Sequence, residues 1–315
     1  MNILFVWSGL TGYMGDCWRE LASRDGVQLK VAVDLGEKQI GGIFSADETL
    51  RGLDWSNDLP GKEYRPDYMF VVGWHNKLCR RAALRDWGAN CRKIICFDMP
   101  WEWCIRKFAA RFVLWRYLRR FDAAFIPGAS TWPYARWLGF SKDRIYRGMY
   151  GTNMERFSPH IGGGGFLYVG RDAPEKGLDV LRTAYAMYKE RGGRWELRIV
   201  NGISPDSLGK IYSGGDCFVL ASRWEPWGVV LAEAAGAGLP VICTDKCGAR
   251  HEVVGTNDFV VKAGDPRALA DAMLKMERLD VEVRNVLGAG NRQLALSYSC
   301  DMWANKVLDI LECLR

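Results

Sequence analysis

Two acidic residues, Glu225 and Glu233, lie in the stretch of the sequence best suited to chemistry on a charged small molecule. Seven residues separate them, and an apolar, alanine-rich run begins soon after the first. We predict that Gly228–Ala237 forms a helix between two short strands, with Pro226 in its first turn, where a missing N–H costs nothing. The two carboxylates would then flank the start of one helix.

The start of this helix is suited to binding phosphate. The N–H groups of Gly228, Val229 and Val230 have no partners within the helix, and the helix dipole adds positive potential at the same place. At ~1.5 Å rise per residue, Glu225 and Glu233 are separated by roughly 12 Å at most. That spacing fits a diphosphate with a hydroxyl-bearing ring at each end, which describes a nucleotide sugar. The plainer alternative is an amphipathic helix with two solvated glutamates.

The stretch Ala221–Val241 resembles the E-x7-E signature of the family 4 glycosyltransferases, which are retaining enzymes of the GT-B fold. The matching positions are Ser222, Glu225, Trp227, Gly228, Glu233, Ala234, Gly238, Pro240 and Val241. The resemblance implies an α/β protein with two Rossmann-like domains that face each other across a cleft. It also implies that Glu233 binds the ribose hydroxyls and that Glu225 is a catalytic residue that orients the transferred sugar. Retention of the anomeric configuration follows from the resemblance alone.

Two basic residues lie in a turn between a predicted strand, 166–170, and a helix that ends near residue 191. Arg171 and Lys176 suit a diphosphate, because a guanidinium binds it as a fork and an ammonium as a compact charge. The segment resembles the family's G-R-x-x-x-x-K-G motif, which implies that both residues bind the donor and stabilise the departing diphosphate. The alternative is a pair of solvated surface charges.

A glycine-rich loop, Ser8–Gly15, follows the first predicted strand, Ile3–Trp7, and suggests that a ligand approaches the backbone closely. Gly12 is the residue that we assign to donor binding in this loop. The next predicted strand ends at Asp34, so a rival interpretation is the dinucleotide site of an NAD-dependent oxidoreductase. The glycines are spaced G-x-x-G-x-x-G and not G-x-G-x-x-G, which disfavours that interpretation.

Asp98 follows a predicted strand at 93–96, and ligands of doubly wound sheets bind at the carboxyl ends of strands. Many family 4 enzymes carry a histidine at the position of Phe97, so we predict that Asp98 contacts the acceptor in its place and is counted with the catalytic residues. A helix-capping role is the alternative for Asp98. We interpret His75, in the preceding turn, as structural.

Trp101–Phe121 is predicted to form one long helix with two apolar stripes, which imply two buried contacts. The stripes are Ile105, Phe108, Phe112 and Trp115, and Ala110, Leu114, Tyr117, Leu118 and Phe121. The domain's own sheet must cover one stripe. Residues 102–120 contain six basic residues and one acidic residue, so the other stripe suits an anionic membrane surface or, alternatively, core packing with solvated arginines.

The chain has 315 residues, of which 49% are hydrophobic and 25% charged, and this fits two soluble domains. We place an acceptor-binding domain at 1–160 and a nucleotide-sugar-binding domain at 161–299. The resemblance implies that a helix at 300–315 crosses back onto the first domain. After the strand at 195–200, where the family commonly receives the base, a βα unit usual in the family is missing. Residues 37–60 are predicted to be loops.

Several features restrict the function. We find no run of about 18 apolar residues, no basic region before the first strand, and no C-x-x-C pair among the ten cysteines. No D-x-D motif and no nucleic-acid recognition motif is present, so we expect neither an obligate metal, nor a cofactor, nor a nucleic-acid partner. We therefore place the chain in the cytoplasm, at most peripheral on the inner face of a membrane.

Taken together, these features predict a hexosyltransferase that uses a UDP- or GDP-sugar. Its acceptor would be a glycan or a lipid-linked glycan in the synthesis of cell-envelope or surface polysaccharide. The alternatives are a sugar-nucleotide epimerase on the same fold, an NAD-dependent oxidoreductase, and a non-catalytic nucleotide-sugar-binding protein.

Overall fold

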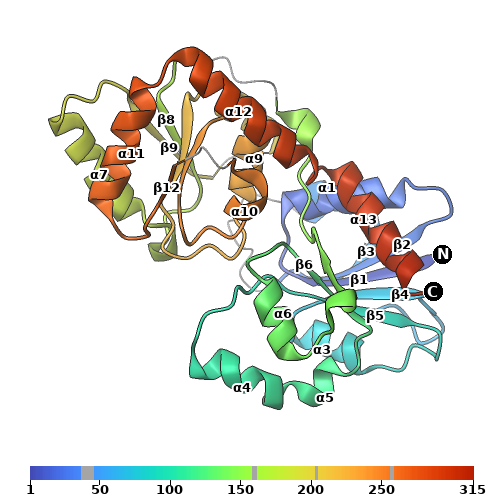
Figure 1. Ribbon diagram of the computed structural model, residues 1–315. Coiled ribbons are helices and arrows are strands. Elements are labelled where there is room, and N and C mark those ends of the chain that lie inside the picture. The colour runs from blue at the N-terminus through green and yellow to red at the C-terminus, as the bar shows by residue number, and fades with distance from the viewer. Residues whose placement is uncertain (37–45, 158–161, 203–204, 256–258) are drawn as a thin grey trace. The chain divides into compact units, whose positions relative to one another are not determined.

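The structure is a computed structural model of the chain and describes residues 1–36, 46–157, 162–202, 205–255 and 259–315. The chain folds into two compact units (Figure 1). Unit 1 comprises Met1–Gly151 and Cys300–Arg315, and unit 2 comprises Thr152–Ser299. The boundary predicted after residue 160 falls within 158–161, which lie outside the described residues.

A seven-stranded parallel sheet forms the centre of unit 1, in the order β3-β2-β1-β4-β5-β6-β7. Its strands are β1 (Asn2–Ser8), β2 (Gln28–Asp34), β3 (Asp54–Ser56), β4 (Tyr68–Val72), β5 (Arg92–Cys96), β6 (Ala123–Ile126) and β7 (Ile145–Arg147). In the middle of the sheet, Val6 of β1 is in register with Ala32 of β2 and Val71 of β4. These central strands are apolar along most of their length, as expected for a sheet that helices cover on both faces.

Helices cover both faces of this sheet (Figure 1). They are α1 (Gly12–Ala22), α2 (Ala46–Thr49), α3 (Lys77–Leu84), α4 (Ile105–Val113), α5 (Trp115–Leu118), α6 (Trp132–Leu138) and α13 (Cys300–Cys313), with the 3-10 turn η1 (Lys142–Arg144). On one face, α1 and α13 pack around Phe5 and Phe70. On the other face, α3, α5 and α6 pack around Met69 and Val71.

The last helix, α13, completes the core of unit 1. Trp303 is buried with its ring 5.8 Å from that of Phe5, and its Nε1 donates to the Met149 carbonyl at 2.8 Å. The Tyr68 hydroxyl donates to the Leu311 carbonyl at 3.0 Å. A helix from the C-terminal end of the chain therefore supplies part of the hydrophobic core built by the first 151 residues.

Unit 2 contains a five-stranded parallel sheet in the order β12-β11-β10-β8-β9. Its strands are β8 (Phe166–Val169), β9 (Leu197–Val200), β10 (Cys217–Leu220), β11 (Val241–Thr244) and β12 (Phe259–Val261). Its helices are η2 (Met154–Arg156), η3 (Pro174–Lys176), α7 (Leu178–Glu190), α8 (Pro205–Ser213), α9 (Val229–Gly236), α10 (Arg250–Val253), α11 (Pro266–Arg278) and α12 (Val281–Leu296). Helices α7 and α11 pack together, and α9 and α10 pack with α12 (Figure 1).

The prediction of one continuous helix at Trp101–Phe121 is wrong. The N–H of its first residue donates to the Ser130 carbonyl at 3.4 Å, and the chain is still extended at Cys104, so α4 begins only at Ile105. Leu114, at φ −92° and ψ 0°, then separates α4 from α5. The break follows a Phe-Val pair, and both residue types have low helix propensity.

The predicted loop region 37–60 also contains regular structure. Within its described part, α2 and β3 are formed, and β3 extends the sheet by pairing Trp55 with Val31 of β2. Residues 37–45 lie outside the described part of the chain. The prediction failed because β3 is a three-residue edge strand, too short to show an alternating pattern.

Candidate functional site

Three loops at the carboxyl edge of the unit 2 sheet are joined by backbone hydrogen bonds. They follow β8, β10 and β11, which are neighbours in the sheet. The Arg223 N–H donates to the Glu175 carbonyl at 2.8 Å, which ties the second loop to the first. The Glu225 N–H donates to the Lys246 carbonyl at 3.2 Å, and the Gly248 N–H donates to the Glu225 carbonyl at 3.0 Å. Glu225 is therefore fixed by its own backbone between neighbouring loops.

Lys176 and Glu225 form an ion pair at this edge. The Lys176 ammonium donates to Glu225 Oε2, and the two side chains are only 15% and 9% exposed. The Ser222 hydroxyl lies 3.5 Å from the same oxygen. The approach of the loops requires a glycine after the lysine: Gly177 has φ +65°, and a Cβ there would collide with the Ala221 carbonyl. The structure thus brings together two of the residues predicted from separate motifs.

Helix α9 begins a few residues after Glu225 in the chain. Its N-cap is Gly228, at φ +94°, and Val229 is its first residue. The prediction that Pro226 lies in the first turn is therefore wrong, since Pro226 lies in the loop before the cap. The amides of Val229 and Val230 lie in the first turn, where helical N–H groups have no intrahelical partner. A Cβ on Gly228 would lie 2.9 Å from Glu225 Cγ, so the carboxylate side chain is packed against the helix start.

Glu233 has a hydrogen-bond partner that the sequence did not predict. The Tyr212 hydroxyl, from α8, donates to Glu233 Oε2 at 2.7 Å, and both side chains are buried. Burial raises the pKa of Glu233, and the Tyr212 hydrogen bond and the charge of Arg156 oppose that rise. Burial and the neighbouring carboxylate raise the pKa of Tyr212 well above its usual value, which keeps its hydroxyl a donor.

Arg171 lies in the same loop as Lys176 but is not in the ion pair. Its guanidinium Nη2 lies 3.2 Å from Glu175 Oε1, and its side chain is 56% exposed. Its carbonyl accepts a 3.0 Å hydrogen bond from the Tyr168 hydroxyl. The Tyr168 hydrogen bond thus fixes the backbone of Arg171, while its guanidinium is exposed to solvent. An anion such as a diphosphate could replace Glu175 as the partner of this guanidinium.

The remaining predicted site residues belong to unit 1. Gly12 is the first residue of α1 and does not lie in the loop before it; Thr11 is the N-cap. Asp98 follows β5, and its Oδ2 accepts a 3.0 Å hydrogen bond from the Tyr150 hydroxyl. The ring of Tyr150 lies edge-on to Tyr13 at 5.5 Å. Burial and Asp98 raise the pKa of Tyr150 well above its usual value, so Tyr150 fixes one oxygen of Asp98.

Two residues from the alternative interpretations also have defined partners. Asp34 accepts hydrogen bonds from Asn76 Nδ2 at 2.6 Å and from the Gly36 N–H at 3.0 Å, and the first of these lowers its pKa most. Burial lowers the pKa of His75, which lies with its ring 5.7 Å from that of Trp74. Of the loop assigned to the base, Asn201 and Gly202 are described, whereas Ile203 lies outside the described residues.

We also searched the described residues for groups of metal ligands and for membrane-spanning helices. Within those ranges, no three His, Cys, Asp or Glu side chains are grouped so that they could hold a metal ion. No helix in the same ranges is both long enough and apolar enough to cross a bilayer.

The sequence and the fold have counterparts among known proteins. Residues 190–294 match the family described as Glycosyl transferases group 1. The whole chain is 29% identical over 171 residues to a phosphatidyl-myo-inositol mannosyltransferase of Mycobacterium leprae, with 46% of each chain covered. It is 29% identical over 140 residues to a D-inositol 3-phosphate glycosyltransferase of Corynebacterium urealyticum, covering 44% of this chain and 32% of that protein. The chain thus spans less than half the length of these curated relatives.

Solved structures resemble the chain over its whole length. Anabaena HepE in complex with UDP and glucose has a TM-score of 0.75 at 14% identity, with 99% of both chains covered. Sucrose-phosphate synthase from Thermosynechococcus elongatus has a TM-score of 0.73 at 16% identity, covering 99% of this chain and 98% of that one. The predicted fold class is confirmed: the chain consists of two parallel-sheet α/β units of the GT-B type.

Proposed function

We propose that this protein is a nucleotide-sugar-dependent glycosyltransferase. The reaction would move a hexose-type sugar from a UDP- or GDP-sugar to a glycan or lipid-linked acceptor. The observation that carries this proposal is the ion pair of Lys176 and Glu225 at the amino end of α9. It places a cation, a carboxylate and helix amides together at the carboxyl edge of a parallel sheet, where ligands of this fold class bind.

Each of these groups has a task in sugar transfer. As the bond between the sugar and the diphosphate breaks, negative charge grows on the diphosphate, and positive charge grows on the anomeric carbon. Lys176, Arg171 and the amides of Val229 and Val230 would stabilise the diphosphate. Glu225 would exchange its contact with Lys176 for the hydroxyls of the transferred sugar. Glu233 would accept hydrogen bonds from the ribose.

We further propose retention of the anomeric configuration, with the acceptor proton passing to the leaving phosphate, because the E-x7-E segment resembles that of retaining enzymes. Asp98, oriented by Tyr150, would bind an acceptor hydroxyl, and Gly12 would contribute to donor binding. No bound metal is required in this scheme, since the positive potential comes from side chains and helix amides. Activity should therefore survive chelation of divalent ions.

The names of the relatives support a particular donor and acceptor class. HepE was solved with UDP and glucose, which favours UDP as the leaving group. The M. leprae and C. urealyticum relatives are named for phosphatidyl-myo-inositol and inositol 3-phosphate, which favours an acceptor with a phosphorylated or lipid-linked polyol. We propose that the reaction takes place in the cytoplasm, at the inner face of a membrane, as a step in glycolipid or envelope glycan synthesis.

The test is a turnover assay with a panel of UDP- and GDP-sugars, first ranked by the thermal shift that each produces. We expect Lys176→Ala, Glu225→Ala and Arg171→Ala each to lower kcat by on the order of 10²-fold or more, because each removes a fixed charge that acts on the transition state. Exposed residues of unit 2 provide matched controls with near-unchanged kcat: Lys275→Ala, Glu282→Ala and Arg267→Ala.

Three outcomes would contradict the proposal. Near-wild-type rates for all three site variants would reject the site. A changed sugar nucleotide in the absence of any acceptor would indicate an epimerase. Binding of a nicotinamide cofactor without affinity for UDP or GDP would indicate an oxidoreductase.

A further inference from the structure

Helix α4 of unit 1 has an apolar face that the described chain leaves uncovered. None of its residues is buried. Ile105 is 87% exposed, Val113 79% and Phe112 64%, and Trp103, just before the helix, is 75% exposed. By contrast, the other predicted stripe is covered, with its C-terminal residues Tyr117, Leu118 and Phe121 buried. Only one of the two expected apolar contacts is therefore made within unit 1.

This arrangement is costly for a helix in water. A nine-residue helix is too short to be stable on its own and normally depends on burial of an apolar face. Here the support is a cluster of aromatic rings at the surface, in which Phe108 lies 4.8 Å from Trp137 and 5.4 Å from Trp103. A contiguous exposed apolar patch of this kind marks an interaction surface.

Basic side chains surround the patch. Arg106, Arg111, Arg116, Arg119 and Arg120 are all exposed, and in the described ranges none of them has a carboxylate within ion-pair distance. Two of them instead lie over aromatic rings: the Arg119 guanidinium is 4.9 Å from the ring of Trp115, and that of Arg111 is 5.6 Å from the ring of Trp137.

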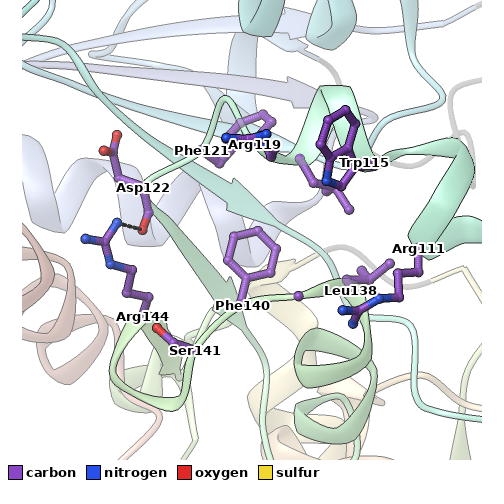
Figure 2. A pocket seen from close by; sticks show the side chains of 11 residues that line it. Arg111, Trp115, Arg119, Phe121, Asp122, Leu138, Phe140, Ser141 and Arg144 are labelled. Carbon is purple, nitrogen blue, oxygen red and sulfur yellow. Dashed lines mark hydrogen bonds between the residues drawn. The ribbon is translucent and has the colours of Figure 1, made fainter.

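A pocket of about 360 Å³ opens beside this patch, between α5, the end of α6 and η1 (Figure 2). Arg111 and Trp115 belong to both the patch and the pocket, and Arg119 and Arg144 add two further guanidinium groups. Figure 2 shows Phe140 between Arg111 and Arg144.

The one acidic residue in the lining is already engaged. Asp122 Oδ2 accepts the N–H of Lys93 at 2.8 Å, and its carbonyl accepts a 3.2 Å hydrogen bond from Arg144. The pocket thus offers three cations to an anion and an aromatic surface to whatever the anion is attached to.

We propose that this face of unit 1 docks on an anionic phospholipid bilayer, with the phosphate of one lipid in the pocket of Arg111, Arg119 and Arg144. Tryptophan and phenylalanine rings partition into the region between headgroups and acyl chains, and arginines beside them bind the phosphates. The charge complementarity and the mixed aromatic and basic composition match a bilayer surface. The inference concerns unit 1 and does not depend on the proposed transfer reaction.

The chain contains its own reporter sites. Cys104, at the N-cap of α4, and Cys313, at the end of α13, are both exposed, and of the other cysteines only Cys91 is not buried. A polarity-sensitive dye is attached to Cys104 in the C91S/C313S variant and, as the matched control, to Cys313 in the C91S/C104S variant. We expect vesicles containing phosphatidylglycerol to shift the dye emission to the blue at Cys104 and not at Cys313. Pure phosphatidylcholine vesicles should shift neither.

Variants separate the two parts of the surface in a vesicle co-sedimentation assay. Phe112→Ser with Val113→Ser should weaken binding at low and at high salt, because it removes apolar contact. Arg119→Gln with Arg144→Gln should weaken binding to phosphatidylglycerol vesicles by at least about tenfold at low salt and should flatten the salt dependence. Arg267→Gln with Arg278→Gln, two exposed arginines of α11, should bind as the unmodified chain does.

Neither donor nor acceptor is present in these assays, so their outcome is independent of transferase activity. Folding of each variant is checked by circular dichroism and by its melting temperature without any ligand, and a misfolded variant is replaced by Trp103→Ser. Equal binding by the α4 variants and the α11 variant would overturn the proposal. Absence of binding to phosphatidylglycerol vesicles, or dimer formation that covers Cys104 without lipid, would also overturn it.

Discussion

At the scale of single residues, the two carboxylates of the candidate donor site have different partners. Lys176 and Glu225 form an ion pair, so each side chain has a partner of opposite charge. For Glu233, the hydrogen-bond partner in the described part of the chain is the neutral hydroxyl of Tyr212. A buried carboxylate with a raised pKa costs stability in its ionised form, a cost that ribose binding by Glu233 would explain under the proposed function.

The raised pKa of Glu233 leads to a prediction for the Glu233→Gln variant. Because the pKa of Glu233 is higher in the folded protein than in the unfolded chain, ionisation of Glu233 at neutral pH destabilises the fold. The amide should therefore raise the melting temperature at neutral pH by roughly 2–4 °C, the shift that ~1 kcal/mol produces in proteins of this size. The gain should shrink as the pH falls through the range in which Glu233 takes up its proton. Calorimetry across pH measures both effects.

The same variant should bind the donor less well. Loss of a charged acceptor for the ribose hydroxyls should lower donor affinity by about 10- to 100-fold, as expected for a hydrogen bond to a charged group. Tyr212→Phe is the informative control, because it keeps the carboxylate but removes its donor and should lower both stability and affinity. A Glu233→Gln protein that melts earlier at neutral pH would contradict this account.

The residue types of the site could be predicted from the sequence, but some of their contacts could not. Arg171, Lys176, Glu225 and Glu233 stand in motifs with fixed spacing, and the structure places all four in unit 2. Tyr212 stands twenty-one positions before Glu233 on a different helix. No spacing rule connects residues on two helices, so a contact of this kind can be found only once the helices are packed.

At the scale of elements, the start of α9 depends on one glycine. Gly228 has φ +94°, and a side chain there would press on Glu225 Cγ. Gly228→Ala should therefore lower the free energy of unfolding by about 1–2 kcal/mol for the left-handed backbone alone. It should also displace Glu225 and reduce kcat by about as much as Glu225→Ala does.

Gly264 provides a matched control for this substitution. It also has a positive φ, +80°, but no atom of the described residues lies within 4 Å of the position that a Cβ would take. Gly264→Ala should therefore show the backbone cost in chemical denaturation without the loss of kcat. Equal activity of the two alanine variants would show that the start of α9 does not position Glu225.

The elements themselves were mostly predictable, and the failures have local causes. Strands such as β1 and β8 are short apolar runs, and both end within one residue of the predicted bounds, 3–7 and 166–170. The helix predicted at 101–121 is interrupted because parts of this segment hydrogen-bond to other segments of unit 1. The N–H of Trp101 donates to the Ser130 carbonyl, and the Tyr117 hydroxyl donates to the Gly73 carbonyl at 3.1 Å. Periodicity cannot report such contacts.

At the scale of the whole molecule, the two units differ in how the chain builds them. Unit 2 is one continuous segment, Thr152–Ser299, with its own sheet. Unit 1 is discontinuous, because Cys300–Arg315 returns to its core. Residues 152–299 are within the ordinary size of a domain that folds alone, and they include every donor-site residue proposed here except Gly12.

We therefore predict that a protein of residues 152–299 folds by itself and binds UDP with an affinity within about tenfold of the full chain, the factor that corresponds to ~1.4 kcal/mol. A protein of residues 1–151 should not fold cooperatively, because it lacks Trp303 and the other buried residues of α13. In the full chain, Trp303→Ala should lower the stability of unit 1 by about 3–5 kcal/mol and leave UDP binding intact. Thermal denaturation and titration calorimetry with UDP test all three proteins. If residues 152–299 melted cooperatively but failed to bind a nucleotide that the full chain binds, the donor site could not lie in unit 2 alone.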